Sequence, residues 1–137
     1  MKNITVVFCL LLCVNFVANA QEKGNLPLTE TEWSLTNLNE KVINKNDEGL
    51  ASFIVFSSDN TFKGFAGCNK FQGVYKIENG KLSLDKIGAT KMECENSNNE
   101  LEFLKALNKS TSFKIVKNQL MLKDKSKTIA IFESKNN

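Results

Sequence analysis

The sequence predicts a small α+β protein that is mostly antiparallel β, with about seven or eight short strands and one helix. Many short runs alternate apolar and polar residues between clusters of turn residues, which is typical of half-buried strands. Asn79-Gly80 separates two such runs and is a strong hairpin signal, because both residues tolerate a positive φ. A single stretch near residue 100 has helical periodicity instead.

The expected strands follow one another in hairpins. Trp33–Leu38 alternates apolar and polar side chains, and a turn precedes its short extension. Ser57-Ser58-Asp59-Asn60 and Lys117-Asn118 supply the turns of two further hairpins. The complete set of expected strands is 33–38 with its extension 41–43, then 51–56, 61–65, 74–78, 81–84, 112–116, 119–122 and 128–132.

One segment breaks the strand pattern. Ser97 and Glu100 form a capping box, in which Ser97 is the N-cap and Glu100 reaches back to its backbone N–H. In the following turns Glu102, Lys105 and Lys109 share one side of a helical wheel. The other side is apolar and is expected to pack on the sheet; its residues are Leu101, Phe103, Leu104, Ala106 and Leu107.

The first twenty residues have the features of a secretory signal peptide. Lys2 precedes an apolar run, Ile4–Val17, and Ala18-Asn19-Ala20 is a small-x-small cleavage site. The run is too short for a membrane-spanning helix, which needs about 20 apolar residues. Cleavage after Ala20 predicts an exported chain that begins at Gln21 and is periplasmic, outer-membrane-associated or extracellular.

A lipid anchor is the alternative to simple cleavage. Cys9 or Cys13 would accept the lipid, but a lipobox cysteine follows a small residue, whereas Phe8 and Leu12 are large. We therefore expect a signal peptide at 1–20, a flexible polar lead-in at 21–31 and one domain at 32–133.

Removal of the signal peptide leaves two cysteines, Cys68 and Cys94. Two cysteines in an exported domain predict one disulfide, because oxidising compartments maintain such bonds. Two buried free thiols, or one reactive thiol, remain the alternative. The pair is neither a C-x-x-C redox motif nor a closed zinc site, which needs four ligands.

The composition excludes several function classes. The chain contains no histidine and no arginine, and the processed chain would carry 17 lysines against 15 acidic residues. No histidine is available as a general base, a nucleophile partner or a metal ligand. Lysines are scattered among acids in the sequence, so no basic stripe for nucleic acid is expected. We expect no cofactor, no metal, no catalytic residue and a monomer.

Gly64–Tyr75, which reads GFAGCNKFQGVY, combines closely spaced glycines with aromatic residues. Glycine at this spacing predicts tight bends and close backbone approach. With an earlier W-x-L segment, the later T-x-M-x-C segment and the helix, this arrangement resembles the META domain family, which includes the bacterial heat-shock protein HslJ. The motif residues are Trp33, Gly67, Asn69, Gly73, Tyr75, Thr90 and Met92, together with the two cysteines.

The resemblance covers roughly Glu32 to Phe132. It implies that the strands curl into a partly open, barrel-like sheet with the helix covering one end or side. It also implies a setting at the cell envelope and a role in stress tolerance or protein contacts, whereas the composition argues against catalysis. Closure of this kind also removes exposed strand edges.

Each candidate site has a structural interpretation beside the functional one. The amide of Asn69 either presents a donor and an acceptor to a ligand or satisfies its own turn, and we favour the turn. Glu93 and Glu95 would share one side of a strand as an acid–base pair, but a solvated face is favoured. The aromatic residues either fill the core, which we favour, or line a cavity for an apolar ligand.

The leading hypothesis is an exported, non-enzymatic HslJ-like domain with an unknown protein partner. The first alternative is a carrier of a small hydrophobic ligand, such as a lipid or acyl chain, inside the sheet. An enzyme or a secreted inhibitor is the third possibility. A cavity lined by phenylalanine and leucine would favour the carrier.

Overall fold

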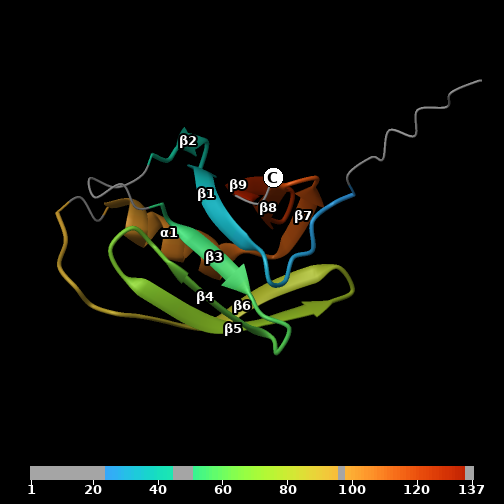
Figure 1. Ribbon diagram of the computed structural model, residues 1–137, viewed down its shortest axis with the longest axis horizontal. Coiled ribbons are helices and arrows are strands. Elements are labelled where there is room, and N and C mark those ends of the chain that lie inside the picture. The colour runs from blue at the N-terminus through green and yellow to red at the C-terminus, as the bar shows by residue number, and fades with distance from the viewer. Residues whose placement is uncertain (1–23, 45–50, 96–97, 135–137) are drawn as a thin grey trace, which may run out of the picture.

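The computed structural model describes residues 24–44, 51–95 and 98–134. The expected signal peptide and the expected cap at Ser97 lie outside these residues. Within them, nine strands form one antiparallel sheet that is not closed, and one helix packs against it (Figure 1). The strands are β1 Glu32–Leu38, β2 Lys41–Val42, β3 Phe53–Phe56, β4 Thr61–Phe65, β5 Lys70–Glu78, β6 Lys81–Ala89, β7 Ser112–Val116, β8 Gln119–Asp124 and β9 Lys127–Ser134.

The strand order is β6-β5-β4-β3-β1-β9-β8-β7, with the short β2 attached to β1. Most neighbours are consecutive hairpins, as the turn residues predict. The exceptions are the pairs β1–β3 and β1–β9, and β9 pairs with β8 on its other side. The last strand therefore joins the β1–β6 part of the sheet to the β7–β8 hairpin.

The strands β5 and β6 are longer than their sequence pattern suggests. They were expected at 74–78 and 81–84, but they begin at Lys70 and end at Ala89, respectively. A β-bulge shifts the register between Gln72 and Val74. Because a bulge places two residues opposite one, it interrupts the alternation from which strands are recognised. The Asn79-Gly80 turn is as expected, with φ values of 50° and 74°.

The interior is filled by aromatic side chains. Phe71 of β5 lies edge-on to Phe103 of the helix, with ring centroids 5.6 Å apart, and Phe103 lies 5.8 Å from Phe132 of β9. Gly73 allows another core ring, that of Phe62, to pack against β5, since a Cβ at Gly73 would stand 2.5 Å from the Phe62 ring and 2.7 Å from the carbonyl oxygen of Asp85. Its expected close approach is therefore confirmed.

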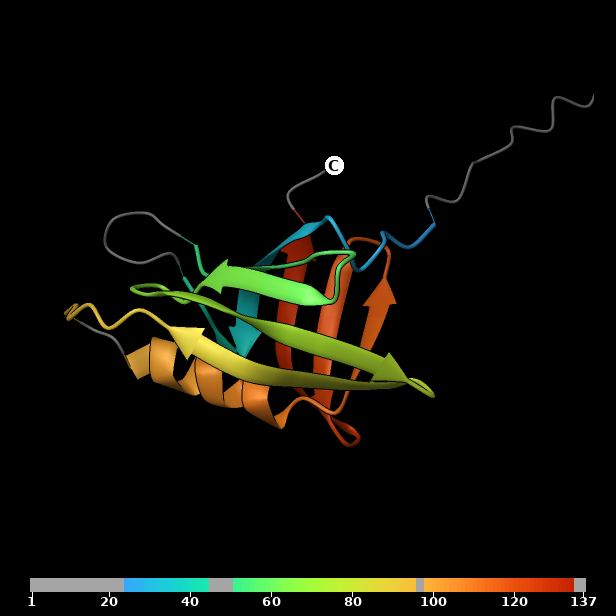
Figure 2. The same ribbon diagram turned by 90° about the horizontal axis from the view of Figure 1, so that it is seen from below.

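The helix α1, Asn98–Lys109, lies along β6 on one side of the curled sheet (Figure 2). Phe103, Ala106 and Leu107 are buried, as their periodicity predicts. Leu101 was expected on the same face but is 57% exposed, so this expectation is wrong. Glu100, three residues before Phe103, occupies the inward position in the first turn instead.

The lead-in packs against the sheet from Leu26 onward. The Leu26 N–H donates to the Lys117 carbonyl oxygen, and the Glu30 N–H donates to the Phe56 carbonyl oxygen. Thr29 also forms a parallel bridge with Phe56. The polar composition that suggested flexibility is thus compatible with an ordered segment, because its backbone groups have partners.

Among the described residues, no helix combines the length and the apolar character that crossing a membrane requires.

Candidate functional site

The turn between β4 and β5 carries the distinctive motif. Its two central residues are Gly67 and Cys68, and it is closed by the Ala66 N–H, which donates to the Asn69 carbonyl oxygen at 2.9 Å. Gly67 has a φ of 101°, a conformation that favours glycine. The Asn69 N–H is free of the turn and donates to Glu100 Oε2 at 2.7 Å.

The side chain of Asn69 is buried, with 3% of the residue exposed. Its Oδ1 accepts hydrogen bonds from the Thr90 hydroxyl and from the Met92 N–H, both at 2.7 Å. Its Nδ2 donates to the Met92 carbonyl oxygen at 3.1 Å and to Glu100 Oε1 at 2.8 Å. The amide therefore uses two acceptor positions and two donors, its full capacity, within the chain.

Glu100 connects this turn to the helix. Its Oε2 accepts a hydrogen bond from the Asn69 backbone N–H at 2.7 Å, while Oε1 accepts from Nδ2. The carboxylate stands in the first turn of α1, where the helix dipole favours negative charge. The capping-box interpretation assigned Glu100 to Ser97 and did not anticipate this partner.

Cys68 and Cys94 form a disulfide, as expected. The free-thiol alternative is therefore wrong. Cys68 is buried in the turn, whereas Cys94 is exposed in the segment that follows β6. The bond cross-links the same two segments that Asn69 joins by hydrogen bonds. We call this group the Asn69 cluster; it consists of Cys68, Asn69, Thr90, Met92, Cys94 and Glu100.

The other motif residues lie elsewhere in the fold. The Trp33 indole N–H donates to the Leu28 carbonyl oxygen at 2.9 Å, and this ring is fully buried. The Tyr75 hydroxyl donates to the Ser57 carbonyl oxygen at 2.8 Å. Burial raises the pKa of Tyr75, and the charges of Asp59 and Glu30 add to this effect. The motif is thus distributed over several packing contacts and does not form one site.

Glu93 and Glu95 do not form an acid–base pair on a strand. Both are exposed, and the segment that contains them is not a strand. The alternation from which a shared side was inferred therefore does not apply. Among the described residues, no three cysteine or acidic side chains are grouped so that they could hold a metal ion.

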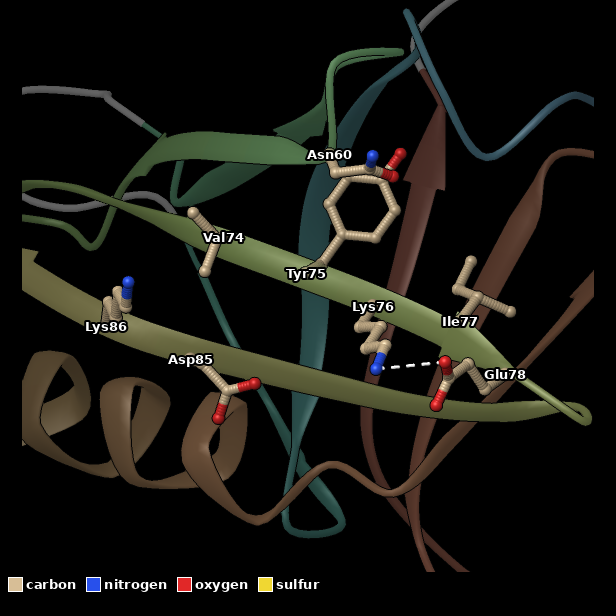
Figure 3. A pocket seen from close by; sticks show the side chains of 8 residues that line it. All are labelled: Asn60, Val74, Tyr75, Lys76, Ile77, Glu78, Asp85 and Lys86. Carbon is tan, nitrogen blue, oxygen red and sulfur yellow. Dashed lines mark ion pairs between the residues drawn. The ribbon is translucent and has the colours of Figure 1, made fainter.

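A depression of about 510 Å³ lies along the β5–β6 hairpin and is lined from both faces of β5 (Figure 3). Its lining is mixed, with the exposed apolar residues Val74 and Ile77 beside an ion pair in which Lys76 Nζ stands 2.9 Å from Glu78 Oε1. Asn60, Tyr75, Asp85 and Lys86 complete the lining. Sequence reasoning missed this surface, because neither its charged nor its apolar residues form a distinctive pattern along the chain.

A second depression, of about 370 Å³, continues toward the hairpin tip and shares Lys76 and Glu78 with the first. None of the core phenylalanines lines either depression. Tyr75, which packs edge-on against Phe56, is the core aromatic residue in the lining of the first depression.

The META domain family matches residues 26–136 of the chain. No curated protein matches the chain. An NMR structure of a protein from Burkholderia xenovorans is similar, at 24% identity and a TM-score of 0.65, over 80% of this chain and 85% of that chain.

Two further structures have the same fold. One NMR structure shares 26% identity with a TM-score of 0.62 over 77% of this chain and 90% of that chain. The crystal structure of a DUF4847 family protein from Bacteroides vulgatus shares 18% identity with a TM-score of 0.56, over 77% of this chain and 93% of that chain.

Proposed function

The chain belongs to the META domain family, and we propose that it is an exported, non-enzymatic member that binds another protein at the cell envelope, in a stress-related role. The observation that carries this proposal is the Asn69 cluster. All four hydrogen-bonding positions of the Asn69 amide have partners within the chain. The motif therefore supports the fold, and ligand binding at Asn69 would require breaking these bonds.

The carrier alternative receives no support from the interior. A carrier needs an apolar cavity, and ligand pockets begin at about 300 Å³. Phe71, Phe103 and Phe132 instead contact one another across the space between the sheet and the helix. Ring separations of this size are those of packed aromatic pairs.

The exposed part of the β5–β6 hairpin, to which both faces of β5 contribute, is the better candidate for contact with a partner. Val74 is 37% exposed and Ile77 is 43% exposed, and both adjoin charged residues that would form a polar rim. Apolar residues inside a polar rim are typical of protein interfaces. We therefore propose that the partner covers the two depressions.

Site-specific photocrosslinking in cells tests this surface. A photoreactive amino acid replaces Val74, and the matched control carries it at Val116, a valine of similar exposure (41%) on β7. We expect one discrete crosslinked protein, identified by mass spectrometry, with the Val74 probe only. Equal products at both positions, or none at Val74, would contradict the assignment of the partner to β5 and β6.

Export is tested separately. The N-terminal sequence of protein recovered from outside the cytoplasm should begin at Gln21. A diacylglyceryl mass on Cys13 would contradict simple cleavage and indicate a lipid anchor, and an intact Met1 would contradict export.

A further inference from the structure

Lysines that are distant in the sequence converge around Thr111, which links α1 to β7. The Leu82 N–H of β6 donates to the Thr111 carbonyl oxygen at 2.9 Å. The Thr111 N–H donates to the Lys123 carbonyl oxygen at 2.8 Å, and the Lys125 N–H donates to the Thr111 hydroxyl at 2.7 Å. Three separate segments are therefore fixed to one another at this point.

Each of these segments carries lysine. Lys81 precedes Leu82, Lys109 ends the helix, Lys123 lies near the end of β8, and Lys125 lies in the turn between β8 and β9. We call these four residues the lysine end. Lys81, Lys109 and Lys125 are exposed, and Lys123 is half-buried. In the part of the chain that the structure describes, none of the four forms an ion pair.

Nearby carboxylates do not neutralise this charge. Glu78, the cross-strand partner of Lys81, forms its ion pair with Lys76. Glu40 is paired with Lys127, whose Nζ stands 3.4 Å from Glu40 Oε1. Asp124 alone lies within the turn segment. Its single charge stands against four lysines, so the lysine end is strongly basic.

The opposite end of the helix has the reverse charge. Glu93 and Glu95 are exposed there beside Lys91, and Glu100 lies in the first turn of α1. Glu93, Glu95 and Glu100 thus lie at this end with Lys70 and Lys91, which leaves one excess negative charge opposite the lysine end. Such a separation orients a protein in the field of a charged surface.

We propose that the lysine end binds an anionic lipid surface. Its lysines project from a hairpin, a helix end and a turn, and Lys109, Lys123 and Lys125 line neither depression. In Figure 2 the C-terminal end of α1 and the β8–β9 turn lie together at the lower side of the molecule. A flat surface can contact the helix end and the β8–β9 turn together, with Lys81 on the outer face of the neighbouring β6, whereas an extended acidic peptide needs a groove to hold it.

The chemistry of lysine fits this partner. An ammonium group is a compact point charge on a flexible stem, so it needs no fixed geometry to contact a phosphate headgroup. Each lysine near an anionic membrane strengthens binding by about fivefold. This inference goes beyond the proposed protein binding and does not depend on it, since the lysine end and the two depressions share only Lys81.

Vesicle cosedimentation of the full chain tests the proposal. The probes are vesicles of phosphatidylglycerol and of phosphatidylcholine. We expect binding to the anionic vesicles only, with a strong decrease as the ionic strength rises toward about 0.15 M. Any contribution of the apolar run Ile4–Val17 is common to all variants and cancels in their ratio.

The double variant Lys109→Gln with Lys125→Gln should bind phosphatidylglycerol roughly 25-fold more weakly, the product of two fivefold effects. The matched control is Lys63→Gln with Lys91→Gln, which removes the same charge from exposed positions elsewhere. The control should lose less than about threefold.

Three results would overturn the proposal. One is no binding to phosphatidylglycerol even at low ionic strength. Another is an equal loss in both double variants, which would assign binding to net charge alone. The third is a preference for polyglutamate over vesicles at equal anionic charge, which would assign the lysine end to an acidic protein segment.

Discussion

The two ends of the helix use their charged residues in opposite ways. At the N-terminal end, Glu100 directs both carboxylate oxygens into the Asn69 cluster. At the C-terminal end, Lys109 stands in the last turn among lysines that form no ion pair with described residues. At the end that carries the distinctive motif, the polar side chains are thus hydrogen-bonded to one another. At the other end, the lysine side chains remain without a charged partner among the described residues. A distinctive sequence motif can therefore stabilise the fold, while surface residues outside the motif bind the partner.

A substitution in the core between the two ends gives the loss of unfolding free energy with which substitutions at either end are compared. Phe103→Ala should reduce the free energy of unfolding by about 4 kcal/mol, because Phe103 contacts Phe71 and Phe132 in a filled interior. Chemical denaturation measures the loss. Leu101→Ala on the same helix should change it by less than about 0.5 kcal/mol, since Leu101 is largely exposed. A small loss for Phe103→Ala would favour the carrier hypothesis instead.

Removal of the disulfide is expected to have the next largest effect. The bond closes a loop between positions 26 apart, and the double variant Cys68→Ala with Cys94→Ala releases that constraint in the unfolded chain. The chain-entropy argument gives a loss of about 3.5 kcal/mol. Denaturation of the wild type with reductant should give a similar loss. An unchanged midpoint in both experiments would show that the hydrogen bonds of Asn69 alone hold this end.

Asn69→Ala isolates those hydrogen bonds while the disulfide remains. It should cost about 3 kcal/mol, because the Met92 N–H and the charged Glu100 carboxylate each lose a partner in a partly buried site. Thr111→Ala, which removes a hydroxyl at the exposed lysine end, is the matched comparison and should cost about 1 kcal/mol or less. Equal losses would remove the distinction between the two ends.

Asn69→Asp tests the same hydrogen bonds through the pH dependence of the free energy of unfolding. Its carboxylate would stand where Nδ2 now lies 2.8 Å from Glu100, so repulsion would raise the pKa of the pair in the folded state. A folded state that binds more protons than the unfolded state gains stability as the pH falls. The variant should therefore recover part of its loss below about pH 5, where carboxyl groups titrate. Asn69→Ala should show no such recovery.

Tyr75 belongs to the motif but lies outside the Asn69 cluster. Tyr75→Phe should cost about 1 kcal/mol at neutral pH, because the hydrogen bond to Ser57 is lost. The pKa of Tyr75 is raised in the folded state, so the unfolded chain releases this proton first. The associated stability is present below about pH 10 and is lost as the pH rises further. The wild type should therefore be more sensitive to alkali than the variant.

The smallest effect is expected at the lysine end. Lys109→Gln with Lys125→Gln should change the free energy of unfolding by less than about 0.5 kcal/mol for each substitution, because both side chains are exposed and unpaired among the described residues. Circular dichroism and denaturation provide the measurement. A loss comparable to that of Asn69→Ala would mean that these lysines support the fold, and the contrast between the ends would disappear.

The sequence predicts those features that depend on neighbouring residues. The Asn79-Gly80 hairpin and the buried helix positions Phe103 and Leu107 belong to this class. The ends of β5 and β6 were missed because a bulge breaks the alternation near Val74. The exposed side chain of Leu101 was missed because nothing local indicates that Glu100 faces inward.

The Asn69 cluster and the lysine end depend on contacts between distant segments. The pairing of Cys68 with Cys94 was predictable by counting, since two cysteines allow one bond. The partners of Asn69, by contrast, are 23 and 31 positions away, and no spacing rule connects them. The lysine end likewise exists only after β6, α1 and β8 meet at Thr111. Its residues are dispersed among acids in the chain.

The position of β9 has a consequence for how the chain is assembled. The strand that is synthesised last pairs with β1, which is synthesised first, and with β8. Until β9 emerges, the β1–β6 sheet and the β7–β8 hairpin have no strand between them, and the edges of β1 and β8 stay open to other chains. Pairing between the two ends of a chain also slows folding. Production of this domain therefore includes an interval in which a nearly complete polypeptide is still vulnerable to aggregation, and release of its final residues ends that interval.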